Sequence, residues 1–229
     1  MSELSERYFK VKERVREACK KAGREEQSVK LVAVSKFHPI ENIIEVAELG
    51  QKEFGENYIQ EALEKIAVRP DLKWHAIGPV QSKKTKEIIG KFSLIESLAS
   101  DSFLRELEKR TQAANCTQDV LLQVNIGREE QKSGLLPEEL LPFAQKVLAV
   151  PTLKLCGLMC LPPLDENPEH TRPYFIQLRE LKEKLEKELG VTLPHLSMGM
   201  SADFPVAIEE GATIIRVGTD IFGPRRPQH

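Results

Sequence analysis

Cysteine, aromatic residues and long apolar runs are scarce in this sequence, and each scarcity excludes a class of protein. The 229 residues include only four cysteines, and these form no C-x-x-C pair and no zinc-ligand spacing, so neither a disulfide framework nor a zinc site is expected. Cys156 and Cys160 are four residues apart in an apolar segment, where we expect them to share one face as small buried hydrophobes. This cysteine usage favours a reducing, cytoplasmic location.

A membrane protein is equally disfavoured. No apolar stretch approaches the roughly 18 residues that a membrane helix needs, and the first twenty residues are charged, with no signal-peptide core.

Charge is balanced rather than one-sided. Lys and Arg total 33 against 35 for Asp and Glu, which gives a net charge of −2. We therefore expect neither nucleic acid nor an anionic membrane as the main partner. The near-neutral surface, with no exposed apolar stripe, favours a monomer, and a composition of 41% apolar and 30% charged residues is typical of a globular protein.

Strand-like and helix-like segments alternate along the chain. Residues 2–22 are predicted to form an amphipathic helix, because apolar residues recur at spacings of three and four before Gly23. The eight strands predicted after it span residues 31–35, 53–56, 73–77, 94–98, 120–125, 153–159, 195–198 and 213–217. The helix predicted in each of the seven intervals spans residues 40–49, 59–66, 83–90, 101–114, 137–150, 173–189 and 203–210.

This alternation predicts βαβ units and a parallel sheet. Eight units in about 200 residues suit a closed (β/α)8 barrel of the TIM type, with the N-terminal helix as an addition. An open doubly wound sheet is the alternative. No linker divides the chain, so we expect a single domain over residues 1–229, with a poorly ordered tail at 224–229.

Lys36 stands at the end of the first predicted strand, after an apolar run. Because strand residues alternate faces, Val32, Val34 and Lys36 point the same way. If that face is a core, desolvation favours the neutral amine and makes Lys36 a nucleophile toward a carbonyl. The alternative is an ordinary lysine that extends into solvent.

The last two predicted strands end in residues suited to an anion. In (β/α)8 barrels, the loops after strands seven and eight often hold a phosphate. The loop containing Met200 and Ser201 precedes a helix, and so offers a hydroxyl and free N–H groups at a positive helix end. Gly218 allows close backbone approach, and Thr219 adds a second hydroxyl. Two tight turns with capping hydroxyls are the alternative.

A lysine and a phosphate site together suggest a ligand with an aldehyde and a phosphate, for which pyridoxal 5′-phosphate (PLP) is the obvious candidate. Arg216 shares a face with Ile214 and Gly218, so it can point inward beneath the pyridine ring. A permanently cationic arginine would keep the ring nitrogen unprotonated and weaken the ring as an electron sink. An outward salt bridge is the other possibility for Arg216.

Several strings resemble one known family, the pyridoxal-phosphate homeostasis proteins, whose fold is similar to the N-terminal barrel of alanine racemase. They occur in colinear order between about residues 5 and 224. The strings are VSK (34–36), FGENYIQE (54–61), WHAIGPVQS (74–82), VNI (124–126), KSG (132–134), GLM (157–159), LSMGMS (196–201) and RVGTDIFG (216–223).

The resemblance implies a role for eight residues in cofactor binding and for none in catalysis. Lys36 resembles the lysine that forms the Schiff base, and Arg216 resembles the partner of the ring nitrogen. Asn57 resembles a residue that lines the cofactor beside this lysine. Ser201, Gly218 and Thr219 resemble the residues that hold the phosphate. His75 and Met200 resemble neighbours of the pocket.

The resemblance further implies a carrier that binds PLP reversibly and buffers it or delivers it to apo PLP-dependent enzymes, without turnover. The alternative is an amino-acid racemase, which needs a second base on the opposite ring face; alanine racemase takes that tyrosine from a second domain. No second domain is expected here, and Tyr8, Tyr58 and Tyr174 have no clear claim to the role. A Schiff-base aldolase acting on a sugar phosphate is a third possibility, but the sequence lacks an evident carboxylate pair for it.

A basic cluster at Lys83, Lys84 and Lys86 is interpreted as a solvated face or as a docking surface for an acidic partner.

Overall fold

The computed structural model describes residues 2–224 and forms a closed barrel in which each strand pairs in parallel with the next and β8 pairs with β1. The predicted (β/α)8 barrel is confirmed, and the open sheet is wrong. The strands are β1 (Lys30–Val34), β2 (Glu53–Glu56), β3 (Lys73–Ala76), β4 (Leu94–Leu98), β5 (Gln118–Val124), β6 (Leu153–Cys160), β7 (His195–Ser197) and β8 (Ile214–Val217).

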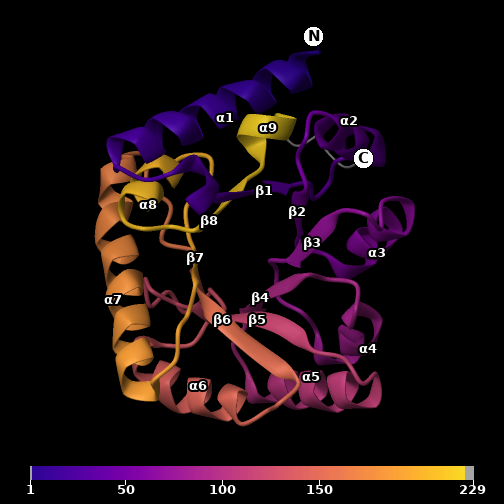
Figure 1. Cartoon of the computed structure of the whole chain (residues 1–229), viewed down its shortest axis with the longest axis vertical. Helices are drawn as coiled ribbons and strands as arrows, with labels where there is room; N and C mark the ends of the chain where they lie inside the picture. The colour runs from indigo at the N-terminus through magenta and orange to yellow at the C-terminus, as the bar shows by residue number, and fades with distance from the viewer. Residues whose placement is uncertain (1, 225–229) are drawn as a thin grey trace.

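Helices surround these strands, as Figure 1 shows. They are α1 (Glu3–Lys21), α2 (Ile40–Glu48), α3 (Ile59–Val68), α4 (Thr85–Ile88), α5 (Asp101–Ala113), α6 (Leu140–Leu148), α7 (Arg172–Leu189), α8 (Phe204–Glu209) and α9 (Thr219–Phe222). Short 3₁₀ helices occur at η1 (Glu26–Ser28), η2 (Ser82–Lys84), η3 (Pro137–Glu139) and η4 (Pro168–Thr171).

The N-terminal helix α1 lies across the part of the barrel where α8 and α9 follow the last two strands (Figure 1). Its start is fixed by Ser2, whose hydroxyl accepts a hydrogen bond from the N–H of Ser5 at 3.0 Å. Leu4, Val11 and Val15 bury its apolar face. The predicted helix at 2–22 is therefore confirmed, and it packs against α8 and α9, which follow the last two strands.

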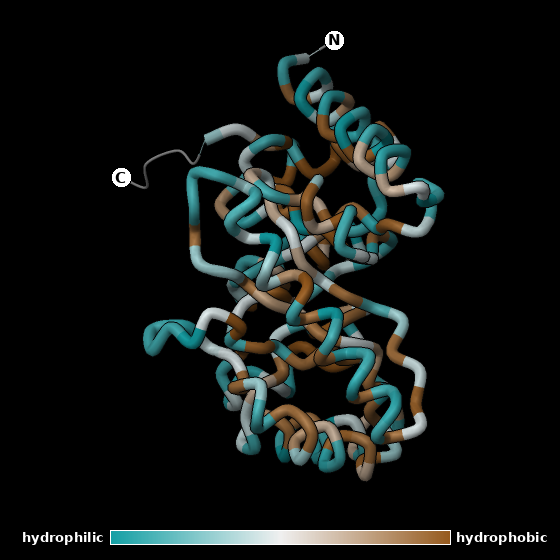
Figure 2. The backbone as a smooth tube through the Cα atoms, turned by 90° about the vertical axis from the view of Figure 1, so that its left-hand side faces the viewer, coloured by the Kyte–Doolittle hydropathy of each residue, from teal (hydrophilic) through white to brown (hydrophobic). Residues whose placement is uncertain are grey.

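Most of the core lies between the strands and the surrounding helices, and a smaller apolar cluster fills the barrel. In Figure 2 the chain through the middle of the molecule is mostly hydrophobic, whereas the outer helices alternate in hydropathy. The inner cluster draws its side chains from five strands and comprises Val32, Leu94, Leu121, Cys156, Met159 and Ile214.

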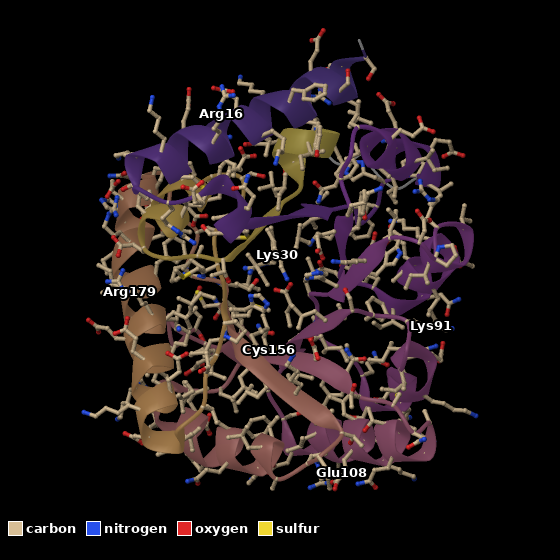
Figure 3. The ribbon with its side chains drawn as sticks, viewed as in Figure 1. Arg16, Lys30, Lys91, Glu108, Cys156 and Arg179 are labelled. Atoms are coloured by element: carbon tan, nitrogen blue, oxygen red, sulfur yellow. The ribbon has the colours of Figure 1, made fainter. Side chains whose placement is uncertain are left out.

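The two cysteines of β6 do not share a face, and that expectation is wrong. Cys156 belongs to the inner cluster, where Figure 3 labels it among the strands, and Cys160 belongs to the outer core. The pairing of β6 with β5 shifts register between Leu155 and Gly157, so Cys156 is an extra residue in the ladder. Beyond this extra residue the alternation of inward and outward side chains is reversed, so Cys160 faces outward. All four cysteines are free thiols.

Other differences from the expected elements are small. The helix predicted at 83–90 is reduced to the short segments η2 and α4. The tail predicted at 224–229 lies, from residue 225 onward, outside the described residues. Within residues 2–224, no helix combines the length and apolarity that crossing a bilayer requires.

Candidate functional site

A cavity of about 470 Å³ opens at the carboxyl ends of the strands. Seven of the eight predicted site residues line it, namely Lys36, Asn57, Met200, Ser201, Arg216, Gly218 and Thr219. Val34, Ile77, Lys132, Leu161, Pro162, Leu164 and Ala202 complete the lining. The barrel thus brings together residues that are up to 183 positions apart in the sequence, and His75 is the one predicted residue outside the lining.

The lysine side of the cavity follows from the alternation of β1. Val32 lies in the inner cluster, and Val34 and Lys36 line the cavity above it, so the three residues point to the same side as predicted. The strand ends at Val34, and a tight turn carries Lys36, closed by a hydrogen bond from the N–H of His38 to the carbonyl of Ser35 at 3.1 Å.

The opposite side of the cavity is built by the turns after β7 and β8. Gly199 has a φ of +94°, and a Cβ there would lie 2.6 Å from the Cβ of Ala207, so only glycine lets this turn pack against α8. The carboxylate of Asp203 accepts a hydrogen bond from the N–H of Met200 at 2.7 Å. The hydroxyl of Ser201 accepts from the N–H of Asp220 at 3.4 Å, which links the two turns.

Arg216 points into the barrel, so the outward salt bridge is wrong. Its side chain is almost fully buried, and its guanidinium donates to the hydroxyl of Ser197 and, at 2.8 Å, to the carbonyl of Cys160. The carboxylate of Glu96, which is also fully buried, lies 3.8 Å from the guanidinium and accepts a hydrogen bond from Ser197. A cation is therefore fixed at the floor of the cavity, with its counter-charge directly beneath it.

His75 is not among the described residues that line the cavity and lies buried within the barrel. Its ring nitrogens contact the carboxylates of Glu96 at 2.7 Å and Glu53 at 2.8 Å. Burial alone would lower the pKa of His75, but hydrogen bonds and charge from the two carboxylates outweigh it and raise the pKa to about 8. His75 thus contacts Glu96, which in turn faces Arg216.

Two further residues at or below the cavity were not singled out from the sequence. Glu96 is the one charged residue in the strand-like run LIESL, whose other residues are apolar or small. Because a buried carboxylate needs a partner, this isolated glutamate could have been recognised from the sequence as a candidate site residue. Lys132 reaches the cavity from the loop after β5, where its ammonium donates to the carbonyl of Pro162 at 3.0 Å and pairs with Glu129. No cluster of metal-ligating side chains occurs in the part of the chain that the structure describes.

Comparison with known proteins defines the class first. The family model for the alanine racemase N-terminal domain matches residues 9–226. An alanine racemase of Clostridium difficile superposes with a TM-score of 0.72 over 94% of this chain and 58% of its own, but at 13% identity this likeness shows the fold alone. The chain is thus a barrel of the alanine racemase N-terminal class.

Nearer relatives define the family within that class. A pyridoxal phosphate homeostasis protein of Aquifex aeolicus is 49% identical over 223 residues, which cover 96% of this chain and 98% of the relative. PipY of Synechococcus elongatus, solved with PLP bound, is 36% identical and superposes with a TM-score of 0.79 over 86% of this chain and 93% of its own. The chain belongs to the pyridoxal phosphate homeostasis protein family.

Proposed function

We propose that this protein binds PLP reversibly through a Schiff base to Lys36 and acts in PLP homeostasis, as a buffer or a source of the cofactor. The observation that carries the proposal is the cavity itself, which gathers two amines (Lys36 and Lys132), one buried guanidinium and two hydroxyls from different strand ends. The bound PLP of the PipY structure supports the same ligand here.

The residues at the cavity fit this cofactor. Asn57 lines the cavity, and its buried side-chain oxygen has no hydrogen-bond partner among residues 2–224, so a polar ligand group is expected beside it. Ser201, Gly218 and Thr219 would hold the phosphate, and Arg216 would face the ring nitrogen. When bound, the cofactor supplies an aldehyde that bonds to an amine and a ring that accepts electrons.

Lys36 would hold the cofactor by a bond that can be reversed. Its amine nitrogen bonds to the aldehyde carbon and one water molecule leaves, so the return of water releases both partners unchanged. Such a bond retains the cofactor without consuming it, which is what a buffer or carrier needs.

Arg216 would make the site a poor catalyst. A guanidinium is permanently protonated and can only donate hydrogen bonds, so it favours an unprotonated ring nitrogen, which withdraws electrons weakly. Glu96 and Ser197 fix the guanidinium in this position. A carrier without turnover is therefore the function we propose.

The racemase alternative requires a second base at the cavity, and the tyrosines offer little support for it. The hydroxyl of Tyr8 contacts Gln51 at 3.3 Å beneath α1. Tyr58 is half exposed and packs against Phe37, with ring centroids 5.0 Å apart. None of the three tyrosines is among the described residues that line the cavity. An assay of alanine racemisation by the PLP-loaded protein tests this alternative.

The assignment of Lys36 is tested by trapping the bond. The protein is incubated with PLP, reduced with borohydride and mapped by peptide mass, beside the variants Lys36→Ala and Lys30→Ala; Lys30 begins the same strand at its opposite, exposed end. We expect a visible band that disappears on reduction and a pyridoxyl mass on Lys36 in the wild type and in Lys30→Ala. A pyridoxyl mass on a lysine other than Lys36 in the wild type would overturn the assignment.

We further propose that the protein is a cytoplasmic monomer that supplies PLP to apo enzymes. Mixing the loaded protein with an apo aminotransferase tests delivery, with a scavenger of free PLP in a parallel reaction. Activation that survives the scavenger indicates direct contact, and activation that the scavenger abolishes indicates release through solvent. No activation in either reaction would contradict delivery.

A further inference from the structure

The turn that carries Lys36 is held from outside the cavity by three charged residues, the buried Glu56 and Lys65 and the partly exposed Glu61, which we term the clamp. Lys65 lies on α3 with its ammonium almost fully buried. The ammonium contacts Glu56 at 2.7 Å and Glu61 at 2.6 Å, and it donates to the carbonyl of Ser35 at 2.8 Å. One end of the clamp thus binds the residue directly before Lys36.

Both neighbours of Lys36 are bound in this way. The hydroxyl of Ser35 donates to the carboxylate of Glu56 at 2.6 Å. On the other side, the N–H of Phe37 donates to the carboxylate of Glu61 at 2.6 Å. The peptide units on either side of the lysine are therefore tied to one charged group.

The backbone at this turn needs such support. Phe37 has a φ of +65°, a left-handed conformation that is uncommon for any residue other than glycine, asparagine or aspartate. Residues in such conformations persist where surrounding contacts determine them, and they occur often at functional sites. The hydrogen bond from Phe37 to Glu61 is a contact of this kind.

General stability is a poor reason for the clamp. Burying an ammonium and carboxylates costs desolvation that their attraction scarcely repays, and apolar residues of similar size often serve as well. The cost is visible at Glu56, where burial raises the pKa of the carboxyl although the neighbouring Lys65 opposes the rise. None of the three clamp residues is among the described residues that line the cavity, and their hydrogen bonds reach the turn at Ser35 and Phe37, the two neighbours of Lys36.

The geometry points to Lys65, with Glu56 and Glu61, as a set of positioning residues for Lys36. By holding Ser35 and Phe37, the clamp fixes the direction in which the Lys36 side chain leaves the turn, and so brings its amine to the aldehyde of PLP. This inference rests on the proposed function, because it concerns the same bond. Lys65 then sets how much of the bound cofactor is covalently held and how quickly it leaves.

The test compares Lys65→Met with Lys65→Arg and with Lys182→Met. Lys182 pairs with Glu186 one helical turn away on α7, far from the turn, and so matches the pair of Lys65 with Glu61. Two probes are used, PLP and pyridoxine 5′-phosphate, which has an alcohol where PLP has the aldehyde and so cannot bond to lysine. The readouts are the fraction of PLP fixed by borohydride, its release rate and the affinity for each probe.

In Lys65→Met we expect release of PLP to become about tenfold faster or more, since hydrogen bonds to a charged group are lost and 1.4 kcal/mol corresponds to tenfold. The affinity for pyridoxine 5′-phosphate should stay within about twofold, which a general loss of structure would not allow. Lys65→Arg keeps the positive charge and should release PLP at close to the wild-type rate. Lys182→Met should match the wild type.

Equal release rates in folded Lys65→Met and wild type would overturn the inference. An equal loss of affinity for both probes would do so too, because it would show a structural role. Should Lys65→Met not fold, Glu61→Gln keeps an acceptor for Phe37 while removing the charge beside Lys65, and unchanged release there would refute the clamp. Absence of a Lys36 adduct in the wild type would instead reject the proposed function itself.

Discussion

The charge on His75 should make the stability of this protein fall as pH rises through neutrality, and Glu53→Gln should remove that dependence. His75 is buried between two carboxylates, which hold its pKa at about 8 in the folded protein. Since that pKa is above the ordinary value of 6.5, the charged form contributes stability that is fully present below pH 6.5 and is lost as pH rises through 8.

The expected magnitude follows from the two pKa values. The difference between about 8 and the ordinary 6.5 corresponds to about 2 kcal/mol in the free energy of unfolding. About 1.5 kcal/mol of this should disappear between pH 6.5 and pH 8.5. Replacing Glu53 by Gln leaves one carboxylate to oppose the desolvation of His75, so its pKa should return toward or below its ordinary value. The fall in stability over this range should then largely vanish.

Urea unfolding at a series of pH values measures the stability, and NMR titration of the imidazole measures the pKa directly. His195→Gln is the control. Burial lowers the pKa of His195, so its ionisation changes the stability only at pH values below about 6.5. It should keep the slope of the wild type. An imidazole pKa of His75 that is unchanged by Glu53→Gln would show that Glu53 does not hold the charge on His75.

Two further predictions concern the turns opposite Lys36. Gly199→Ala should destabilise the protein by about 1–3 kcal/mol in urea unfolding, because its φ of +94° is left-handed and the new Cβ would meet Ala207 at 2.6 Å; a change below about 0.5 kcal/mol would contradict this. Arg14 lies over the ring of Phe204 at 4.5 Å and donates to the carbonyl of Ser201 at 3.3 Å. Arg14→Ala should weaken PLP binding a few-fold without removing the Lys36 adduct, as measured by titration, and unchanged affinity would show that α1 does not support the cradle.

The alternation of β1 and β8 made the main site residues predictable. Lys36 stands two positions after Val34, and Arg216 two after Ile214, so a period of two places both toward the barrel interior once the strands are correctly identified. The parallel barrel then brings their carboxyl ends together. The same logic failed at Cys160, because the shift in register near Gly157 inverts the alternation; the glycine inside the strand was the signal that could have predicted this irregularity.

Lys65 shows what the sequence could not reveal. Four residues after Glu61 on a helix, it reads as an ordinary surface ion pair. Its burial arises because the fold brings the ammonium on α3 to the carbonyl of Ser35, directly after β1. The placement of His75 likewise depends on Glu53 and Glu96 from the neighbouring strands, and these contacts are tertiary.

A crystal structure of the protein grown with PLP would show whether Lys36 holds the cofactor in this cavity. We expect electron density continuous from the side chain of Lys36 to the cofactor, the phosphate at Ser201, Gly218 and Thr219, and the guanidinium of Arg216 at the ring nitrogen. Density for the cofactor elsewhere on the molecule, or in the cavity with its phosphate toward Lys36, would contradict the proposed binding of PLP by these residues.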